Sequence, residues 1–247
     1  MFNITLPVRN ADQITIRRSI PWLLHQRWQN VVFFHWKVEP AIIEKYIPVN
    51  TEPDLFEDTC WLSIVLFSSM NNHLKKMPSI HILPDFYEIN LRTYVVCKRV
   101  PGICFLDIKA SSAMAVLVNR LLGLPYKKGR FSRLQKTECD DTFYHYNDLN
   151  YINTRYKAGS PLIKTAKDLW LTERYVAFQS VKNNTLAFPV AHKPWPLQKM
   201  DVSSVDIYWR FKNLYLANSE LNCMHFAPAA EVNLWYPQRF NGGQINS

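Results

Sequence analysis

Short hydrophobic runs, interrupted by polar and turn-forming residues, predict that most of this chain is β-strand. The first clear run is VVFFHWKV at 31–38, whose β-branched and aromatic residues are typical of a buried strand. A second run, CWLSIVLFSSM, occupies 60–70, and we expect it to form a hairpin with residues 55–56 through Glu57-Asp58-Thr59.

The strongest hairpin signal lies at 86–110. The first arm is FYEINLRTYVVCKRV at 86–100, and we expect Pro101-Gly102 to turn the chain into ICFLDIKA at 103–110. Because side chains alternate along a strand, one face of the first arm carries three polar residues, Glu88, Asn90 and Arg92. Further strands are predicted at 131–138, 142–148, 152–159, 175–193 (a hairpin across Lys182-Asn183-Asn184), 205–218 and 223–236.

Helical patterns are few and short. Pro40 and Pro48 bracket about two turns of helix. A second helix is expected to start at Ser111 or Ser112 and to end at Gly123, with one apolar face formed by Met114, Leu117, Val118, Leu121 and Leu122. A third is expected within 160–175, ending near Leu171, while the polar, proline-bearing stretch 71–85 is expected to be a long loop that covers a site.

These elements predict an α+β fold with a single domain. About a dozen strands and two or three short helices are spread over the whole length, with no internal repeat and no compositional shift. Such a pattern favours a large, mainly antiparallel β-barrel or sheet.

Composition and charge narrow the functional classes. The chain is 48% hydrophobic and 14% aromatic, which is ample for a core, and its net charge is +9. The Lys and Arg residues are scattered, so the charge indicates either a solvated basic surface or a weak site for polyanions, with no specific nucleic-acid motif. Five cysteines without a CxxC pair, no apparent signal peptide and no long apolar stretch lead us to expect a cytoplasmic protein that is not bound to membranes.

Two groups of residues could carry chemistry. The turn Pro125-Tyr126-Lys127-Lys128 places two ammonium groups side by side, and mutual repulsion near apolar surface would make one of them nucleophilic. The polar face of Glu88, Asn90 and Arg92 is either a solvated stripe or, inside a barrel, a site for an anionic or carbonyl-containing molecule.

Other candidate sites are weaker. The histidines at 35, 73, 81, 145, 192 and 225 form no HxxxH or HxH pair, so we predict no metal site and no cofactor. Glu173 and Arg174 are expected to pair structurally, and Trp195, between two prolines, to form a packing corner. The chain has no Gly-rich phosphate loop and no GxSxG motif.

The order of several stretches resembles the YqjF-like proteins, a family defined by domain of unknown function 2071. The matching stretches, in order, are WQNVVFFHWKV, CWLSIVLF, FYEINLRTYV, PGICFLDIKASSAMAV, LLGLPYKKGRF, LWLTERY, HKPWPLQ and MHF. They cover residues 25 to 226, nearly the whole chain. The residues that look like family hallmarks are Glu88, Asn90, Arg92, Tyr94, Pro125, Tyr126, Glu173, Arg174, His192, Pro194 and Trp195.

The resemblance implies an acetoacetate-decarboxylase-like β-barrel at 25–240, with an extension at 1–24 packed on it and a tail at 241–247. Enzymes of that superfamily form a Schiff base between a lysine and a keto acid. By this likeness Lys127 would be the nucleophile, and Lys128 would lower its pKa.

The sequence therefore leaves three functions open. The first is binding of a small anionic or carbonyl-containing molecule in the barrel, without assured turnover, through Glu88, Asn90, Arg92, Tyr94, Tyr126, His192 and Trp195. The second is a decarboxylase-like enzyme acting through Lys127 and Lys128, so enzyme activity is uncertain at this point. The third is weak binding of polyanions; a homo-oligomer is compatible with all three.

Overall fold

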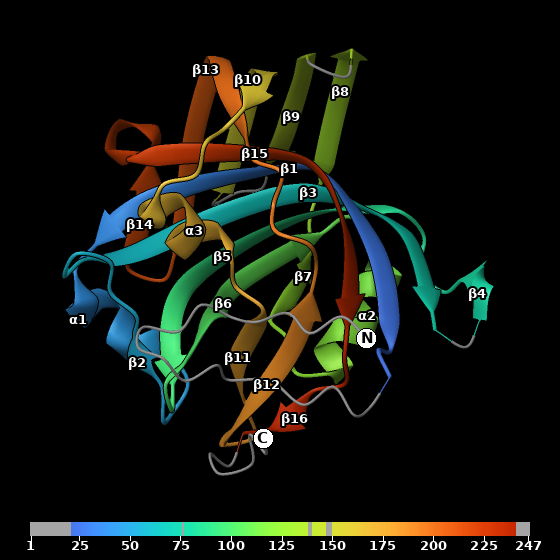
Figure 1. Cartoon of the computed structure of the whole chain (residues 1–247), viewed down its shortest axis with the longest axis vertical. Helices are drawn as coiled ribbons and strands as arrows, with labels where there is room; N and C mark the ends of the chain where they lie inside the picture. The colour runs from blue at the N-terminus through green and yellow to red at the C-terminus, as the bar shows by residue number, and fades with distance from the viewer. Residues whose placement is uncertain (1–20, 76, 138–139, 147–149, 241–247) are drawn as a thin grey trace.

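The computed structural model describes residues 21–75, 77–137, 140–146 and 150–240 (Figure 1). The predicted extension and tail thus lie, apart from residues 21–24, outside the described residues. The helices are α1 (Pro40–Ile43), α2 (Ala113–Leu121) and α3 (Ala166–Thr172), with 3₁₀ turns at Glu44–Tyr46 and Asn218–Glu220. The strands are β1 (Leu24–Val38), β2 (Glu52–Pro53), β3 (Cys60–Leu74), β4 (Met77–His81), β5 (Phe86–Cys97), β6 (Val100–Ala110), β7 (Tyr126–Lys128), β8 (Phe131–Thr137), β9 (Asp140–Tyr146), β10 (Asn150–Pro161), β11 (Val176–Val181), β12 (Asn184–Ala191), β13 (Gln198–Phe211), β14 (Leu214–Ala217), β15 (Cys223–Leu234) and β16 (Gln238–Arg239).

The predicted fold class is confirmed, because the strands form one large sheet that closes on itself. Neighbouring strands run in the order β12, β11, β6, β5, β3, β1 and β15, and β15 then pairs back onto β12. Val190 opposite Leu234 and Ala191 opposite Asn233 make this closure. We call these strands the closed ring. All its pairs are antiparallel except β6 with β11, which run parallel.

A second layer covers one side of the ring. Beyond β15 the sheet continues through β13, β10, β9 and β8, which stand above the ring in Figure 1. Outward-facing residues of the ring, such as Phe34, Leu66 and Leu91, join Phe143 and Trp209 of this layer in the main hydrophobic core. Because the ring strands are covered on this side too, their sequences read as almost continuously apolar.

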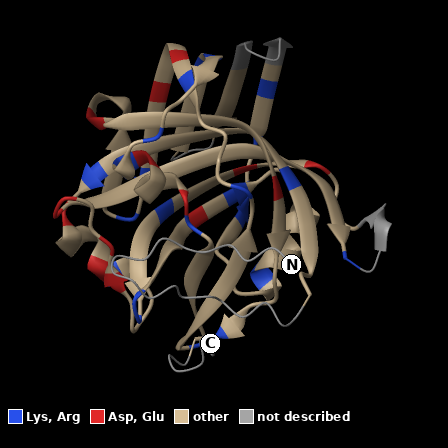
Figure 2. Ribbon diagram, in the orientation of Figure 1, with Lys and Arg blue, Asp and Glu red and all other residues tan. Residues whose placement is uncertain are grey.

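Charged residues are interspersed over the elements and not gathered on one of them. Figure 2 shows segments of both colours, Lys and Arg in blue and Asp and Glu in red, spread over many elements of the described ribbon. The distribution agrees with the scattered pattern in the sequence.

One predicted turn is wrong in detail. The hairpin between β5 and β6 turns at Lys98 and Arg99, both with positive φ, and Pro101-Gly102 lies inside β6. Gly102 has a different purpose, since a Cβ there would lie 2.7 Å from the Val176 carbonyl oxygen and 2.8 Å from the Phe178 ring. Only glycine lets β11 approach β6 this closely.

The expected loop at 71–85 is largely strand. β3 continues to Leu74, and β4 pairs with it through His73 opposite His81 and Leu74 opposite Met77. Polar residues in this stretch are compatible with strand because the pair stands away from the ring, as Figure 1 shows.

Helix α2 forms where the sequence places it, but its apolar face is turned outward. The Ser112 side chain caps it by accepting from the amide of Ala115, and Gly123 follows with φ of 92°. Leu117 and Leu121 are 61% and 80% exposed, and the buried side consists of small or short residues, Ala115 and Val116.

Replacing Gly102 tests the close contact between β6 and β11. We expect Gly102→Ala to lower the free energy of unfolding by about 1–3 kcal/mol, since the added methyl group meets a backbone carbonyl. Gly159→Ala is the control, because its nearest heavy atom would lie 3.3 Å away. Urea unfolding measures both; equal stability of the two variants would contradict the packing role of Gly102.

Candidate functional site

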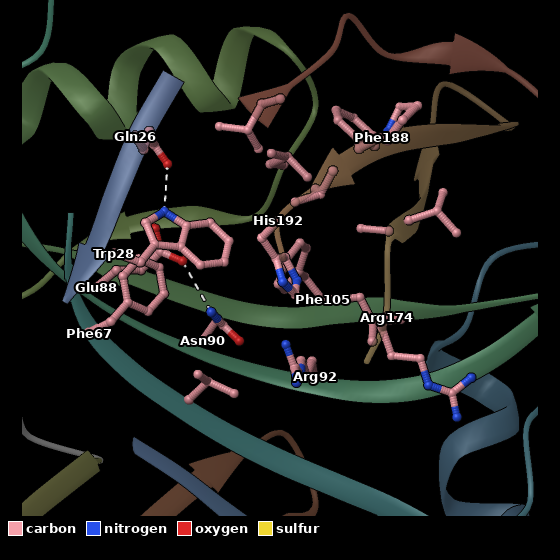
Figure 3. Close-up of a pocket in the computed structure, with 18 of the residues that line it drawn as sticks. Gln26, Trp28, Phe67, Glu88, Asn90, Arg92, Phe105, Arg174, Phe188 and His192 are labelled. Carbon is pink, nitrogen blue, oxygen red and sulfur yellow. Dashed lines mark hydrogen bonds between the residues drawn. The ribbon is translucent and has the colours of Figure 1, made fainter. Parts of the chain in front are cut away.

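The closed ring encloses a cavity of about 120 Å³ (Figure 3). Its walls are mainly apolar and aromatic, with contributions from all the strands of the ring. Polar side chains are few, and they are Gln26, Glu88, Asn90, Arg92, Asn119, Tyr126, Thr172, Arg174 and His192. An apolar cavity with a small number of convergent polar groups is the usual form of a small-molecule site.

Strand β5 supplies the polar centre of this cavity. Glu88, Asn90 and Arg92 alternate with Ile89 and Leu91, so the three polar side chains share the inner face. All three are buried, with 5%, 3% and 8% of their surface exposed. Of the two interpretations that the sequence left open, the barrel interior is confirmed, and the solvated stripe is wrong.

Glu88 is held by two hydrogen bonds and has no cationic partner among the described residues. Tyr126 Oη donates to Glu88 Oε2 at 2.7 Å, and Asn90 Nδ2 donates to Oε1 at 3.1 Å. Burial raises the pKa of Glu88 to about 7, although both hydrogen bonds oppose this rise. The carboxyl group is therefore able to gain or lose a proton near neutral pH.

Arg92 is a buried cation for which the described part of the chain supplies no carboxylate partner. Among the described residues, its Nε and Nη2 atoms have no hydrogen-bond partner, and its guanidinium lies 5.5 Å from the centre of the Phe33 ring. Burial lowers the pKa of Arg92, and the Tyr94 hydroxyl partly offsets this. A buried charge without an ion-pair partner is costly, so an anion in the cavity would find a prepared site.

Arg174 also lines the cavity, but its guanidinium already forms an ion pair within the protein. Its Nη1 donates to Asp54 Oδ2 at 2.6 Å and its Nε to the Trp170 carbonyl at 2.8 Å. In Figure 3 its guanidinium points away from the other polar groups of the cavity. The comparison singles out Arg92 as the available cation.

Two residues predicted as ligand-binding form a fixed aromatic wall. The rings of His192 and Trp195 lie 4.5 Å apart, and His192 Nδ1 donates to the Lys193 carbonyl. Trp195 Nε1 donates to the Thr172 carbonyl at 3.0 Å. Burial lowers the pKa of His192, so its imidazole is neutral at neutral pH and its Nε2 can accept a hydrogen bond.

The expected pair of Glu173 and Arg174 is wrong. Glu173 instead accepts hydrogen bonds from Lys164 Nζ, Tyr175 Oη and the backbone amide of Trp195. These contacts fasten the loop before α3 to the Trp195 corner, which is why Trp195 reaches the cavity.

Tyr94 is not part of the cavity wall. Its hydroxyl lies behind the wall, 2.6 Å from Ser63 Oγ and 2.7 Å from the Leu171 carbonyl. Tyr126, by contrast, does line the cavity.

The structure does not bring Lys127 and Lys128 into the cavity. β7 runs parallel to β6, and alternation along it places Lys127 opposite to Tyr126. The Lys127 side chain is 59% exposed, and its Nζ lies 3.0 Å from Asp107 Oδ1. Lys128, also exposed, donates to the Ser111 carbonyl. The two ammonium groups therefore have separate partners, and neither faces Glu88 or Arg92.

Sequence reasoning missed Gln26 and Trp28 as cavity residues. Trp28 Nε1 donates to Gln26 Oε1 at 2.8 Å, and the Trp28 and Phe67 rings, tilted by 32°, have their centres 4.6 Å apart. The only signal was that Trp28 opens the stretch WQNVVFFHWKV. Among the described residues no group of three or more His, Cys, Asp or Glu side chains is arranged to hold a metal ion, and no described helix is long and apolar enough to cross a membrane.

Comparison with known families identifies the chain. Residues 25–231 match the model of DUF2071, described as an uncharacterized conserved protein. The chain belongs to the DUF2071 family. This DUF2071 protein is also 30% identical over 231 residues to the uncharacterized protein YqjF of Bacillus subtilis (strain 168), covering 88% of this chain and 93% of YqjF.

Solved structures resemble the DUF2071 protein in fold. The enduracididine biosynthesis enzyme MppR complexed with pyruvate has a TM-score of 0.65 at 10% identity, over 92% of this chain and 93% of MppR. An acetoacetate decarboxylase from Legionella pneumophila has a TM-score of 0.61 at 15% identity, over 87% and 86%. At these identities the likeness shows the acetoacetate-decarboxylase-like fold alone.

Substituting Glu88 tests its raised pKa through stability. A carboxyl group with a pKa of about 7 in the folded state and 4.5 unfolded stabilises the fold fully below pH 4.5 and loses this contribution as pH rises through 7. We expect the free energy of unfolding of Glu88→Gln to rise by up to about 3 kcal/mol relative to that of the native protein as the pH increases from 4.5 to 8.5.

Urea unfolding across this pH range measures the difference. The exposed Glu220→Gln serves as control and should follow the native pH profile. A constant difference between Glu88→Gln and the native protein would contradict the raised pKa.

Proposed function

We propose that this protein binds a small organic carboxylate inside its closed ring. The observation that carries the proposal is the buried guanidinium of Arg92, whose Nε and Nη2 have no hydrogen-bond partner among the described residues. Arginine binds carboxylates with two parallel hydrogen bonds, and burial strengthens such bonds. No described carboxylate is among the groups that influence the Arg92 guanidinium, so the ligand would supply the carboxylate that neutralises its charge.

Asn90 suggests what else the ligand carries. Its Nδ2 is used by Glu88, but its Oδ1 is buried without a hydrogen-bond partner among the described residues. Since an amide oxygen only accepts, the ligand would bear a hydroxyl or amino hydrogen near this atom. Asn90 stands two residues from Arg92 along β5, about 7 Å, which suits a short hydroxy or amino acid.

The walls and volume set the size of the ligand. The cavity holds about 120 Å³, and Trp28, Phe67 and Trp195 surround its polar centre with aromatic surface. That space suits a molecule with a few carbon atoms and excludes a nucleotide. Glu88, at the end of the polar row away from Arg92, adds a group that accepts or donates a proton near neutral pH. The pyruvate complex of MppR, a protein of the same fold, supports the choice of small acids as probes.

Binding of small acids tests the proposal. We expect ligand-detected NMR to show binding of at least one acid from a panel of pyruvate, lactate, acetoacetate and alanine. Arg92→Met should lower the affinity for the tightest-binding acid about 10- to 100-fold, because charge-assisted hydrogen bonds are lost. The exposed Arg120→Met removes a guanidinium outside the cavity and should leave affinity unchanged. Two results would contradict the proposal: Arg92→Met binding the acid as tightly as the native protein, or the native protein binding acetone as tightly as acetoacetate.

The alternative of Schiff-base catalysis through Lys127 gains no support from its position. Lys127 is exposed and bound to Asp107, away from Glu88 and Arg92. We expect incubation with acetoacetate and borohydride to leave Lys127 without a mass increase in peptide mass spectrometry, with Lys127→Met as the reference digest. A stable adduct on Lys127 would restore the decarboxylase-like function.

A further inference from the structure

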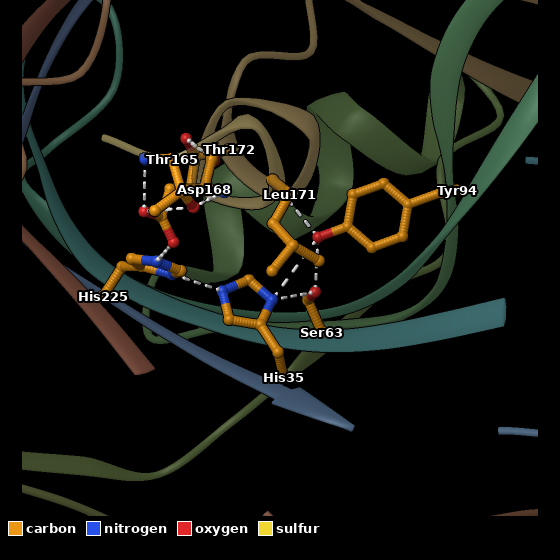
Figure 4. Close-up of polar contacts among 8 residues, drawn as sticks. All are labelled: His35, Ser63, Tyr94, Thr165, Asp168, Leu171, Thr172 and His225. Atoms are coloured by element: carbon orange, nitrogen blue, oxygen red, sulfur yellow. Dashed lines mark hydrogen bonds and ion pairs between the residues drawn. The ribbon is translucent and has the colours of Figure 1, made fainter. Parts of the chain in front are cut away.

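A row of buried polar side chains lies behind the cavity wall, and no function described above uses it (Figure 4). Its five members come from different elements: His35 from β1, Ser63 from β3, Tyr94 from β5, Asp168 from α3 and His225 from β15. None is more than 8% exposed. Burying so many polar groups is costly unless each is hydrogen-bonded, so the contacts between them decide what the row does.

The members touch one another in sequence, apart from one longer contact of 3.5 Å between Tyr94 Oη and His35 Nδ1 that passes Ser63 and is not counted below. The contacts are Asp168 Oδ1 to His225 Nε2 at 2.8 Å, His225 Nδ1 to His35 Nε2 at 3.0 Å, His35 Nδ1 to Ser63 Oγ at 2.7 Å, Ser63 Oγ to Tyr94 Oη at 2.6 Å, and Tyr94 Oη to the Leu171 carbonyl at 2.7 Å. All are at hydrogen-bond distance, so each requires one hydrogen.

Both ends of the row can only accept. The Leu171 carbonyl has no hydrogen to give. Asp168 is held as a carboxylate, because its Oδ2 accepts from the Thr165 amide and hydroxyl in the capping box of α3, and these bonds, with that of His225, lower its pKa despite burial. The hydrogens for all contacts must therefore come from the four side chains between the two ends.

Counting hydrogens shows that the row is one short. Neutral His225, His35, Ser63 and Tyr94 each supply one hydrogen, whereas the row has five contacts. In the neutral row Tyr94 donates to the Leu171 carbonyl, Ser63 to His35, His35 to His225, and His225 to Asp168. The contact between Ser63 and Tyr94 is then without a hydrogen. One additional proton fills every contact.

We propose that this row is a proton relay that stores one proton on His225 and reverses its hydrogen bonds when it does so. In the protonated row His225 donates to both Asp168 and His35, His35 donates to Ser63, Ser63 to Tyr94, and Tyr94 to the Leu171 carbonyl. The charge remains beside the Asp168 carboxylate, and His35 stays neutral but changes its tautomer.

The conversion balances without movement of heavy atoms. The hydrogen of His35 Nε2 moves to His225 Nδ1, and that of Ser63 moves to His35 Nδ1. A hydronium ion gives a proton to Ser63 Oγ, directed at Tyr94, and leaves as water. Three bonds to hydrogen break, one of them in the hydronium ion, three replace them, and the added proton appears as positive charge on His225.

The surrounding charges set where the proton resides. Lys164 and Lys167 near α3 and Arg92 on β5 disfavour a cation in the row, and Asp168 favours one on His225. Burial lowers the pKa of both histidines, that of His35 well below its usual 6.5. The row is therefore neutral at pH 7 and takes up its proton in acid. Tyr94 also interacts with Arg92, a residue of the cavity wall, so a reorientation of hydrogen bonds in the row would reach the cavity through Tyr94.

Nitrogen NMR of histidine-labelled protein tests the relay directly, with no ligand. Between pH 8 and pH 4 we expect His35 to change from the Nε2–H to the Nδ1–H tautomer while neutral, with the same midpoint at which His225 becomes a cation. His145 and His192 are internal controls, since Nδ1 of each donates to a backbone carbonyl and keeps its hydrogen throughout. An unchanged tautomer of His35, or a positive charge on it, would overturn the proposal.

A pair of serine variants separates the relay from general titration. Ser63→Ala cuts the row between His35 and Tyr94, so the tautomer change should disappear and the midpoint of His225 should shift to lower pH. Ser69→Ala removes another buried hydroxyl of β3, one that contacts Asn72 outside the row, and should titrate like the native protein. Identical titration of the two variants would rule the relay out.

Discussion

The pairing of β15 with β12 is the constraint on which the candidate site depends. Val190 opposite Leu234 and Ala191 opposite Asn233 join the two ends of the ring, and the Trp235 amide extends the contact to the Pro189 carbonyl. Without this closure the inner face of β5 would meet solvent, and Arg92 would be an ordinary surface cation. With it, a guanidinium and a carboxyl group share a mainly apolar cavity, where charges are screened less than at the surface.

The buried charges fall into two kinds, and the contrast between them defines the site. Arg174 is paired with Asp54, and Glu173 with Lys164, so these four residues fasten loops to the ring. Arg92 has no such partner among the described residues, and Glu88 is held only by neutral groups. A fold gains little from an unpaired buried charge, so these two residues are the ones to which the proposed ligand would bind.

The local sequence pattern predicted the strands and which side chains share a face of each strand. It did not predict which elements cover each face. Alternation along 86–97 placed Glu88, Asn90 and Arg92 together, and only the closure of the ring showed that this face is interior. The same limit applies to α2, whose apolar face is exposed because its smaller residues, Ala115 and Val116, make the contact. Which face a pattern buries depends on partners distant in the sequence.

The lysine pair was predicted to act together because the two residues are adjacent in sequence. The proposed relay was not predicted because its residues are far apart in sequence. Lys127 and Lys128 are neighbours, yet in a strand neighbours point to opposite sides, so their ammonium groups have different partners. His35 and His225 are separated by 190 positions, yet antiparallel pairing of β1 with β15 brings their rings into hydrogen-bond contact.

Both cases have the same physical origin. Chemistry in a sheet is organised across strands, between residues whose register only the tertiary fold determines. The acetoacetate-decarboxylase-like fold therefore does not fix the chemistry of this chain, because the fold specifies the ring and the side chains on its inner face specify the site. Here those side chains are a guanidinium, an amide and a carboxyl group on β5, while the lysines of β7 lie outside the cavity.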